Sequence, residues 1–202
     1  MKIIVIIGGI GSGKSTVSKG FTRHGAAFMD LDQVGHDVLL RPDVIVDMVA
    51  AFGTDILDAD GAVVRSALAA KAFATPQATA QLNEISHPRL IADAKERLAA
   101  FAAEGRPACV VEISPYDGPQ GSFGVFTDMA DATVAVVAPI ELRVKRAVAR
   151  GMDEADVRAR MARQVSDEQR REWADYVIDN DADLDTLSAR IDAVWDAIVS
   201  AH

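Results

Sequence analysis

The run Gly8-Gly9-Ile10-Gly11-Ser12-Gly13-Lys14-Ser15, close to the start of the chain, constrains the fold more than any other feature. It fits the pattern G-x-x-x-x-G-K-[ST], in which glycines let successive backbone N–H groups turn inward around a phosphate. In this pattern Lys14 supplies a positive charge for the β- and γ-phosphates, and the Ser15 hydroxyl is a ligand for Mg²⁺. The sequence therefore predicts a binding site for a nucleoside triphosphate.

The segments on either side of this phosphate loop support that prediction. Residues 3–7 form an unbroken apolar, β-branched run, which is typical of a central parallel strand buried on both faces. After the loop, Val17 and Phe21 are spaced four residues apart, which indicates a helix whose N-terminal dipole points at the anion. A glycine-rich turn without a ligand, the alternative, explains neither flanking segment.

Apolar strand candidates alternate with helical stretches along the whole chain. The candidates are Lys2–Ile7, Ala26–Met29, Pro107–Ile113, Ala132–Ala138 and Tyr176–Ile178. This alternation predicts an α/β fold with a doubly wound, five-stranded parallel sheet. The expected helices between the second and third strands are Val44–Phe52, Ser66–Phe73, Gln77–Ile85 and Arg89–Ala103. A simple crossover needs one helix, so residues 33–106 are predicted to be a helical insertion that holds an acceptor substrate.

Several helix ends and faces are also marked in the sequence. Residues 166–169 match a capping box, and Asp153 followed by Asp156 places acidic groups at another helix N-terminus. The last helix is predicted to bury one apolar face, formed by Ile191, Val194, Trp195, Ile198 and Val199. Trp195 is therefore expected in the core.

The charge of the chain is unevenly distributed. The 202 residues carry a net charge of −9, which argues against a general affinity for nucleic acid or an anionic membrane. Nine of the 21 Lys and Arg residues nevertheless fall between positions 143 and 171. Arg143, Arg146 and Arg150 have the spacing of one helical face, and Arg158 and Arg163 are expected on the next helix. Residues 141–171 are predicted to form a basic helical lid over a triphosphate, with a solvated basic face as the alternative.

Cysteine usage and the chain start point to the cytoplasm. Cys109 is the only cysteine, lies in an apolar run and is expected to be a small buried hydrophobe. No signal peptide precedes the first strand, and no apolar stretch reaches the ~20 residues that span a bilayer. We therefore expect a cytoplasmic protein with a small-molecule substrate, no nucleic-acid or membrane partner, and a monomeric or weakly homo-oligomeric state.

Three carboxylates follow predicted strands, where ligands collect in open α/β sheets. Asp30 and Asp32 stand two apart on a segment expected to be extended, so that their side chains project from the same side. Asp32 could accept a proton from an attacking hydroxyl, and Asp30 could orient Lys14 or a metal-bound water; alternatively, one of them caps a helix beginning near position 33. Glu112 ends the third strand, where it would serve the magnesium shell or be a surface carboxylate.

Taken together, these residues resemble the dephospho-coenzyme A kinase family over nearly the whole chain. The resemblance rests on residues 8–16, 29–32, 52–57, Asp60-Gly61, Arg65, 82–88, the arginines of 143–150, Gln164 and 174–180. It implies a single P-loop kinase domain over residues 1–202 that uses ATP and Mg²⁺ to phosphorylate the ribose 3′-hydroxyl of dephospho-coenzyme A, the last step of coenzyme A synthesis.

The resemblance also implies roles for individual residues. Asp32 matches the catalytic base, and Lys14 and Arg146 match the cations that contact phosphate. The ATP site would be formed by Gly9, Ile10, Gly11, Ser12, Gly13, Lys14, Ser15, Thr16, Arg143 and Asn180, with Ser15 on the metal. The acceptor would be bound by Asp32, Arg65, His87 and Glu112.

The chain departs from the family pattern at three places. Ile7 replaces the usual Thr before the double glycine, and Asp181-Ala182 lacks the usual glycine. Residues 112–119 replace a Pro-Leu-Leu-Phe-Glu-like stretch that helps to form the acceptor pocket. Two alternatives therefore stay open: another small-molecule kinase of the nucleoside or nucleotide class with a changed acceptor site, or a non-catalytic nucleotide-binding protein. A guanine-specific switch is disfavoured because the chain has no Asn-Lys-x-Asp motif.

Overall fold

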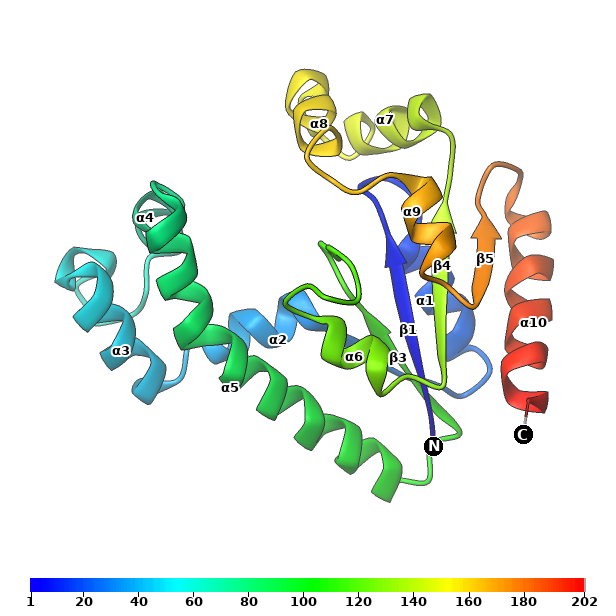
Figure 1. Ribbon diagram of the computed structural model, residues 1–202, viewed down its shortest axis with the longest axis horizontal. Helices are drawn as coiled ribbons and strands as arrows, with labels where there is room; N and C mark the ends of the chain where they lie inside the picture. Colours follow the sequence, from blue (N-terminus) through cyan, green and yellow to red (C-terminus); the bar gives the residue numbers. More distant parts are fainter. Residues whose placement is uncertain (202) are drawn as a thin grey trace. The chain divides into compact units, whose positions relative to one another are not determined.

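The chain divides into two compact units in a computed structural model that describes residues 1–201. Unit 1 comprises Met1–Asp30 together with the chain from Ala100 onward, and unit 2 comprises Leu31–Ala99. Unit 1 contains the sheet and the phosphate loop, whereas unit 2 is built from helices (Figure 1).

Unit 1 is organised by a five-stranded parallel sheet of order β2-β3-β1-β4-β5. Its strands are β1 (Lys2–Gly8), β2 (Ala27–Asp30), β3 (Ala108–Glu112), β4 (Ala132–Val137) and β5 (Tyr176–Asp179). The central strand β1 places Ile6 beside Glu112 of β3 on one side and beside Val134 of β4 on the other. The predicted doubly wound sheet is confirmed, and each strand lies within one residue of its predicted bounds.

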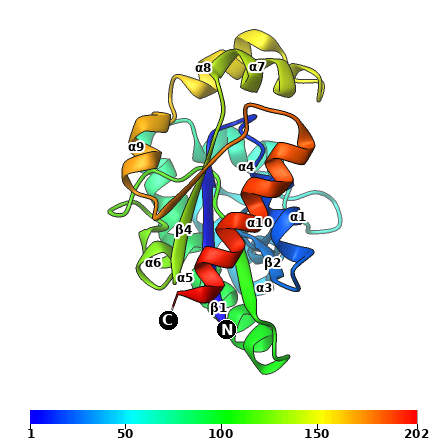
Figure 2. The same ribbon diagram turned by 90° about the vertical axis from the view of Figure 1, so that its right-hand side faces the viewer.

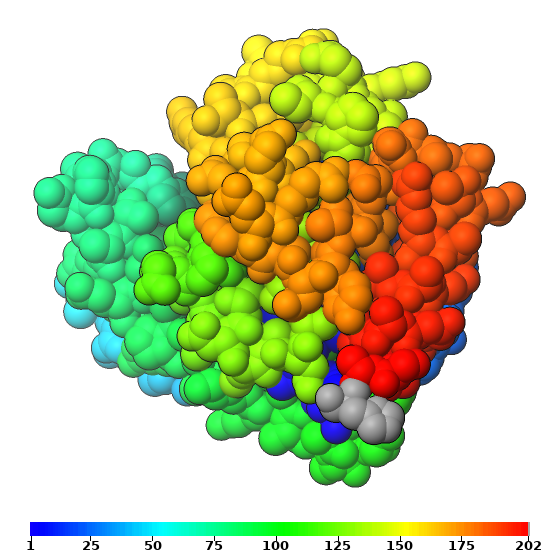
Figure 3. Space-filling view, turned by 45° about the vertical axis from the view of Figure 1, so that its right-hand side comes forward, coloured from blue at the N-terminus to red at the C-terminus, as the bar shows by residue number. Residues whose placement is uncertain are grey.

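Helices cover both faces of this sheet (Figure 2). They are α1 (Lys14–Thr22), α6 (Gly124–Asp128), α7 (Ile140–Val148), α8 (Glu154–Met161), α9 (Asp167–Glu172) and α10 (Leu184–Ser200). Helices α1 and α10 pack on one face, where the rings of Phe21 and Trp195 have centroids 6.0 Å apart within a continuous apolar core. Helices α6 and α9 lie over the other face. In the space-filling view, the surfaces of β5 (orange) and α10 (red) adjoin (Figure 3).

The marked helix ends agree with the structure. The Gln169 backbone N–H donates to the Ser166 hydroxyl, and the Ser166 backbone N–H donates to the Gln169 side-chain oxygen. The capping box of α9 is therefore formed. The Asp153 carboxylate caps α8 by accepting from the backbone of Asp156. On α10, Trp195 is buried as predicted, but Val199 is 46% exposed. The prediction for Val199 is wrong because its neighbour Ile198 takes the core position in the last turn.

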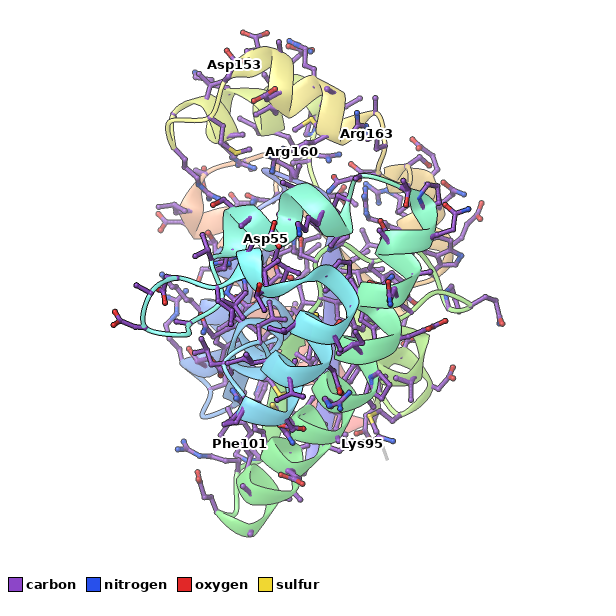
Figure 4. All side chains as sticks on the ribbon, turned by 90° about the vertical axis from the view of Figure 1, so that its left-hand side faces the viewer. Asp55, Lys95, Phe101, Asp153, Arg160 and Arg163 are labelled. Atoms are coloured by element: carbon purple, nitrogen blue, oxygen red, sulfur yellow. The ribbon has the colours of Figure 1, made fainter. Side chains whose placement is uncertain are left out.

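The two helices of the predicted lid, α7 and α8, are shorter than the arginine spacing indicates. Helix α7 ends at Val148, so Arg150 lies beyond it, next to Gly151 with a φ of 89°. Helix α8 ends at Met161, so Arg163 lies beyond it; Figure 4 labels Arg160 and Arg163 in this part of the chain. The prediction that Arg143, Arg146 and Arg150 share one helical face is therefore wrong for Arg150, because a left-handed glycine follows the end of α7.

Unit 2 contains α2 (Leu31–Val38), α3 (Pro42–Phe52), the 3₁₀ turn η1 (Thr54–Ile56), α4 (Arg65–Ala72) and most of α5 (Pro76–Ala103). The two helices predicted on either side of Pro88 are one continuous helix, α5. Proline removes a backbone donor from this turn. Around this position, the Ser86 hydroxyl donates to the Leu82 carbonyl and the Arg89 guanidinium to the Ile85 carbonyl, both at 2.8 Å.

The chain turns from strand to helix directly after Asp30. Asp30 is the last residue of β2, whereas Asp32 lies in the first turn of α2. The prediction that both carboxylates project from one side of an extended segment is therefore wrong, because α2 begins at Leu31, two residues before the expected start.

The burial of Cys109 and the character of the helices bear on two further predictions. Cys109 is fully buried in β3, and burial raises the pKa of its thiol to about 12, so the prediction of a buried hydrophobe is confirmed. Within residues 1–201, no helix is long and apolar enough to cross a bilayer.

Candidate active site around the phosphate loop

The phosphate loop joins β1 to α1 at the carboxyl end of the central strand. Gly13 has a φ of 101°, and α1 begins at the next residue, Lys14. The Lys14 ammonium donates to the Gly8 carbonyl at 3.0 Å and lies 3.5 Å from the Ser114 hydroxyl. Only 8% of Lys14 is exposed, and its ammonium group is held at the loop, where a phosphate would bind.

A buried carboxylate faces the first turn of α1. Glu112, at the end of β3, accepts from the Ser15 hydroxyl at 3.2 Å and from the Ser18 hydroxyl at 3.0 Å. Its exposure is 8% and that of Ser18 is 1%. Because Ser18 holds the second carboxylate oxygen, Glu112 keeps its first oxygen directed at Ser15.

Asn180, which directly follows β5, supports the loop from another side. Its side-chain amide donates to the Ser12 carbonyl at 2.7 Å, so close to Gly13 that a Cβ there would collide with it. Arg146 of α7 donates to the backbone carbonyl of Asn180 at 3.0 Å and to its side-chain oxygen at 3.2 Å. Partial burial lowers the pKa of Arg146, and repulsion from Arg150 adds to this effect.

The peptide groups of Ile10 are held by two side chains from the predicted lid region. The Ile10 N–H donates to Gln164 Oε1 at 3.0 Å, and the Ile10 carbonyl accepts from Arg143 Nε at 2.9 Å. The Ile10 side chain packs against a small cluster of Val144, Ala147 and Val157 from α7 and α8. Both the N–H and the carbonyl of Ile10 are therefore hydrogen-bonded to side chains of this region.

Asp167 joins two buried guanidinium groups behind this contact. Its carboxylate accepts from Arg143 NH1 at 3.1 Å and from Arg170 NH1 at 2.6 Å. Arg143 is 5% exposed and Arg170 is 2% exposed. Burial lowers the pKa of Arg170, and the hydrogen bond to Asp167 opposes that effect. One carboxylate thus serves two buried arginines, which leaves net positive charge beside the loop.

A cavity of about 690 Å³ borders the same group of residues. It lies between the carboxyl ends of β4 and β5 and the helices α7, α8 and α9, with Arg143, Gln164 and Asp167 in its lining. Its other charged lining residues include Arg171 and Asp179, which form an ion pair with each other.

The predicted site residues fall into two groups. Lys14, Ser15, Glu112, Arg143, Arg146 and Asn180 surround the phosphate loop in unit 1. Asp30 stands opposite Glu112 in the β2–β3 ladder. Asp32, Arg65 and His87 belong to unit 2, where the Arg65 guanidinium lies 2.6 Å from His36 Nε2.

Several residues of this network were not predicted. Ser18 could have been found, because it lies three residues after Ser15 and so on the same helical face. Asp167 and Arg170 are also three residues apart, so their pairing has a local signal, but their contact with Arg143 does not. Ser114 and His36 carry no local signal, because their partners are distant in the sequence. Within residues 1–201, no three His, Cys, Asp or Glu side chains are grouped as a metal site.

The fold and this site define a P-loop kinase. A crystal structure from Thermus thermophilus superimposes with a TM-score of 0.80 over 97% of both chains at 30% identity. A dephospho-CoA kinase from Campylobacter jejuni has the same fold, with a TM-score of 0.65 over 98% of this chain and 97% of that one at 20% identity.

Sequence comparison gives the family. The model of the dephospho-CoA kinase family matches residues 2–186. A dephospho-CoA kinase from Corynebacterium diphtheriae is 41% identical over 198 residues, 96% of each chain. The chain belongs to the dephospho-CoA kinase family, ATP-dependent phosphotransferases that catalyse the final step of coenzyme A biosynthesis.

Proposed function

We propose that this chain transfers the γ-phosphoryl group of ATP to the 3′-hydroxyl of dephospho-coenzyme A with the residues described above. Unit 1 binds the nucleotide, the helical insertion over residues 33–106 binds the acceptor, and residues 141–171 form a lid. The observation that carries this proposal is the arrangement of Lys14, Ser15 and Glu112 at the phosphate loop.

The ATP site comprises Gly9, Ile10, Gly11, Ser12, Gly13, Lys14, Ser15, Thr16, Arg143 and Asn180. Backbone N–H groups of the loop and the start of α1 bind the phosphates, and Lys14 neutralises charge on the β- and γ-phosphates. Arg146 adds a cation where the charge of the transferring phosphoryl group is spread over its oxygens.

The donors at Ser15 and Glu112 fit Mg²⁺. A hydroxyl and a carboxylate oxygen 3.2 Å apart are hard oxygen ligands of the kind that Mg²⁺ prefers, together with waters and phosphate oxygens. Ser15 is the direct ligand, and Glu112 serves the surrounding shell. When bound there, the ion would neutralise negative charge on the phosphates.

Asp32, Arg65, His87 and Glu112 form the acceptor side of the site. Asp32 is the catalytic base: it takes the proton of the 3′-hydroxyl as that oxygen forms a bond to the γ-phosphorus and the bond to the ADP oxygen breaks. Arg65 and His87 bind the anionic acceptor. The transition state is loose, so positioning and charge neutralisation supply most of the acceleration.

An ADP-release assay with Mg²⁺-ATP tests the proposal. Dephospho-coenzyme A is expected to stimulate ADP release strongly, whereas adenosine, AMP and shikimate in parallel reactions are not. Stimulation by another alcohol alone would favour the alternative kinase, in which the segment from Ser114 to Pro119 has changed the acceptor. Nucleotide binding without stimulation by any acceptor would contradict catalysis.

The location and assembly of the enzyme complete the proposal. We place it in the cytoplasm, as a monomer or a weak homo-oligomer without nucleic-acid or membrane partners. Sedimentation at micromolar concentrations, with and without substrates, tests the oligomeric state.

A further inference from the structure

We propose that Arg143 is a positioning residue that shapes the phosphate loop through its backbone, and that Asp167 sets the orientation of Arg143. This inference rests on the proposed function for the nucleotide it concerns. It assigns Arg143 a role through the loop and not through direct contact with phosphate, and it gives Asp167 and Arg170 a role in nucleotide binding.

Two of the three guanidinium nitrogens of Arg143 donate to protein groups. Nε donates to the Ile10 carbonyl at 2.9 Å, while NH1 donates to both carboxylate oxygens of Asp167 at 3.2 and 3.1 Å. The remaining nitrogen, NH2, lies so close to Gly9 that a Cβ at that position would collide with it. The side chain therefore packs against the loop backbone while only 5% of the residue is exposed.

Gln164 binds the same loop residue as Arg143, namely Ile10. It accepts from the Ile10 N–H at 3.0 Å, so both the donor and the acceptor of Ile10 are bound to side chains. A free loop of glycines would have to lose conformational freedom when it closes around a phosphate. A loop already held at Ile10 loses less, which favours nucleotide binding.

Asp167 decides which way the Arg143 guanidinium points. Without this carboxylate, two buried guanidinium groups would repel each other across the place that it occupies. Arg170 in turn holds Asp167 at 2.6 Å, so the carboxylate stays in place when Arg143 is removed. This asymmetry lets Arg143 and Asp167 be tested separately.

A positioning role predicts a specific kinetic pattern. The loop surrounds phosphates that are present in ATP, in ADP and in the transition state, so loss of its preorganisation weakens all three by the same factor. The dissociation constants of ATP and ADP should rise together, while kcat at saturating ATP stays nearly unchanged. A direct contact with the transferring phosphoryl group would instead lower kcat and leave ADP affinity unchanged.

The first test is Arg143→Met, which keeps an apolar stem and removes the guanidinium. We expect the dissociation constants of ATP and ADP, measured by calorimetry, to rise about tenfold, as for loss of a charged hydrogen bond, with kcat within about threefold of wild type. The matched control is Arg106→Met, which removes a half-exposed arginine paired with Glu104 and should leave both constants unchanged. A fall in kcat with unchanged ADP affinity would overturn the proposal.

The second test is Asp167→Asn, for which the two roles of Arg143 predict different changes in ADP affinity. If Arg143 acts through the loop, loss of its anchor weakens ADP binding several-fold although Arg143 is still present. If Arg143 binds phosphate directly, its release from Asp167 leaves ADP binding unchanged or tighter, and the proposal fails. Should this variant not fold, as judged by thermal unfolding, the Arg143→Met result decides alone.

These measurements separate the inference from the proposed function. Binding of ATP and ADP requires no acceptor, so the positioning role can hold even if dephospho-coenzyme A fails to stimulate ADP release. Conversely, full activity with dephospho-coenzyme A and unchanged nucleotide affinity in Arg143→Met would refute the positioning role alone.

Discussion

The two units of the chain hold their polar groups in different ways. The buried polar or charged side chains among residues 1–201 all belong to unit 1: Ser12, Lys14, Ser18, Glu112, Thr133, Arg143, Arg170 and Asn180. Ion pairs of unit 2, such as Arg97 with Asp37 and Lys71 with Asp55, join side chains that are more than a third exposed.

Buried polar networks and exposed ion pairs have different effects on a structure. A buried charge that loses its partner is costly, so a buried network fixes atoms in place. An exposed ion pair contributes little and is screened by salt, so it tolerates change. Most of the buried polar groups lie around the phosphate loop, where the geometry of a phosphate has to be matched closely.

Lys14→Ala should nearly abolish turnover. It removes the buried cation at the Gly8 carbonyl, and loss of one such stabilising group typically costs about 10²- to 10³-fold in rate. ADP release at saturating substrates measures the effect, and circular dichroism checks that the fold is retained. Turnover within tenfold of wild type would mean that another cation replaces Lys14.

Asp32→Asn tests the one residue of unit 2 that is expected to take part in proton transfer. Loss of a general base should lower kcat by about 10²-fold or more, with little change in the KM for ATP, because Asp32 is not part of the phosphate loop. A rate within a few-fold of wild type would rule out Asp32 as the base. The same assay on Asp93→Asn, elsewhere in unit 2, controls for loss of a carboxylate.

Ser12→Ala should stabilise unit 1 slightly. The Ser12 hydroxyl is fully buried, and it is the one such side-chain atom without a hydrogen-bond partner in residues 1–201. Since an unpartnered buried hydroxyl is unfavourable, we expect the free energy of unfolding to rise by about 1 kcal/mol. Urea denaturation measures this change, and a clear loss of stability would show that the hydroxyl has a partner.

Arg97→Gln should have the smallest effect, below about 1 kcal/mol in the free energy of unfolding. The Arg97 guanidinium, followed by Gln33, lowers the pKa of Asp37, so the pair stabilises the fold when Asp37 is ionised. This contribution is fully present above the ordinary carboxyl pKa of about 4 and is lost as pH falls through the lowered value. Denaturation at pH 7 and pH 2.5 should show a smaller difference between variant and wild type at the lower pH, and a constant difference would contradict this account.

Local sequence patterns were enough for the sheet and for part of the site. The apolar runs of β1 and β3 and the glycine pattern of residues 8–15 act over a few neighbours, so they predicted strand bounds within one residue and the position of Lys14 and Ser15. Local patterns failed where a boundary depends on the surrounding structure. Helix α2 begins at Leu31 and α5 continues through Pro88, and such boundaries are set by tertiary context, which overrides local propensity.

Patterns of neighbouring residues were sufficient for the parallel sheet and for the phosphate loop that ends at Lys14 and Ser15. What Arg143 and Arg146 contact depends instead on how distant parts of the chain pack together. Spacing along a helix places Arg143 and Arg146 near each other, but one is directed at Ile10 and Asp167 and the other at Asn180. The burial and hydrogen bonding of these two arginines depend on groups 24 to 133 residues away, which no local pattern records.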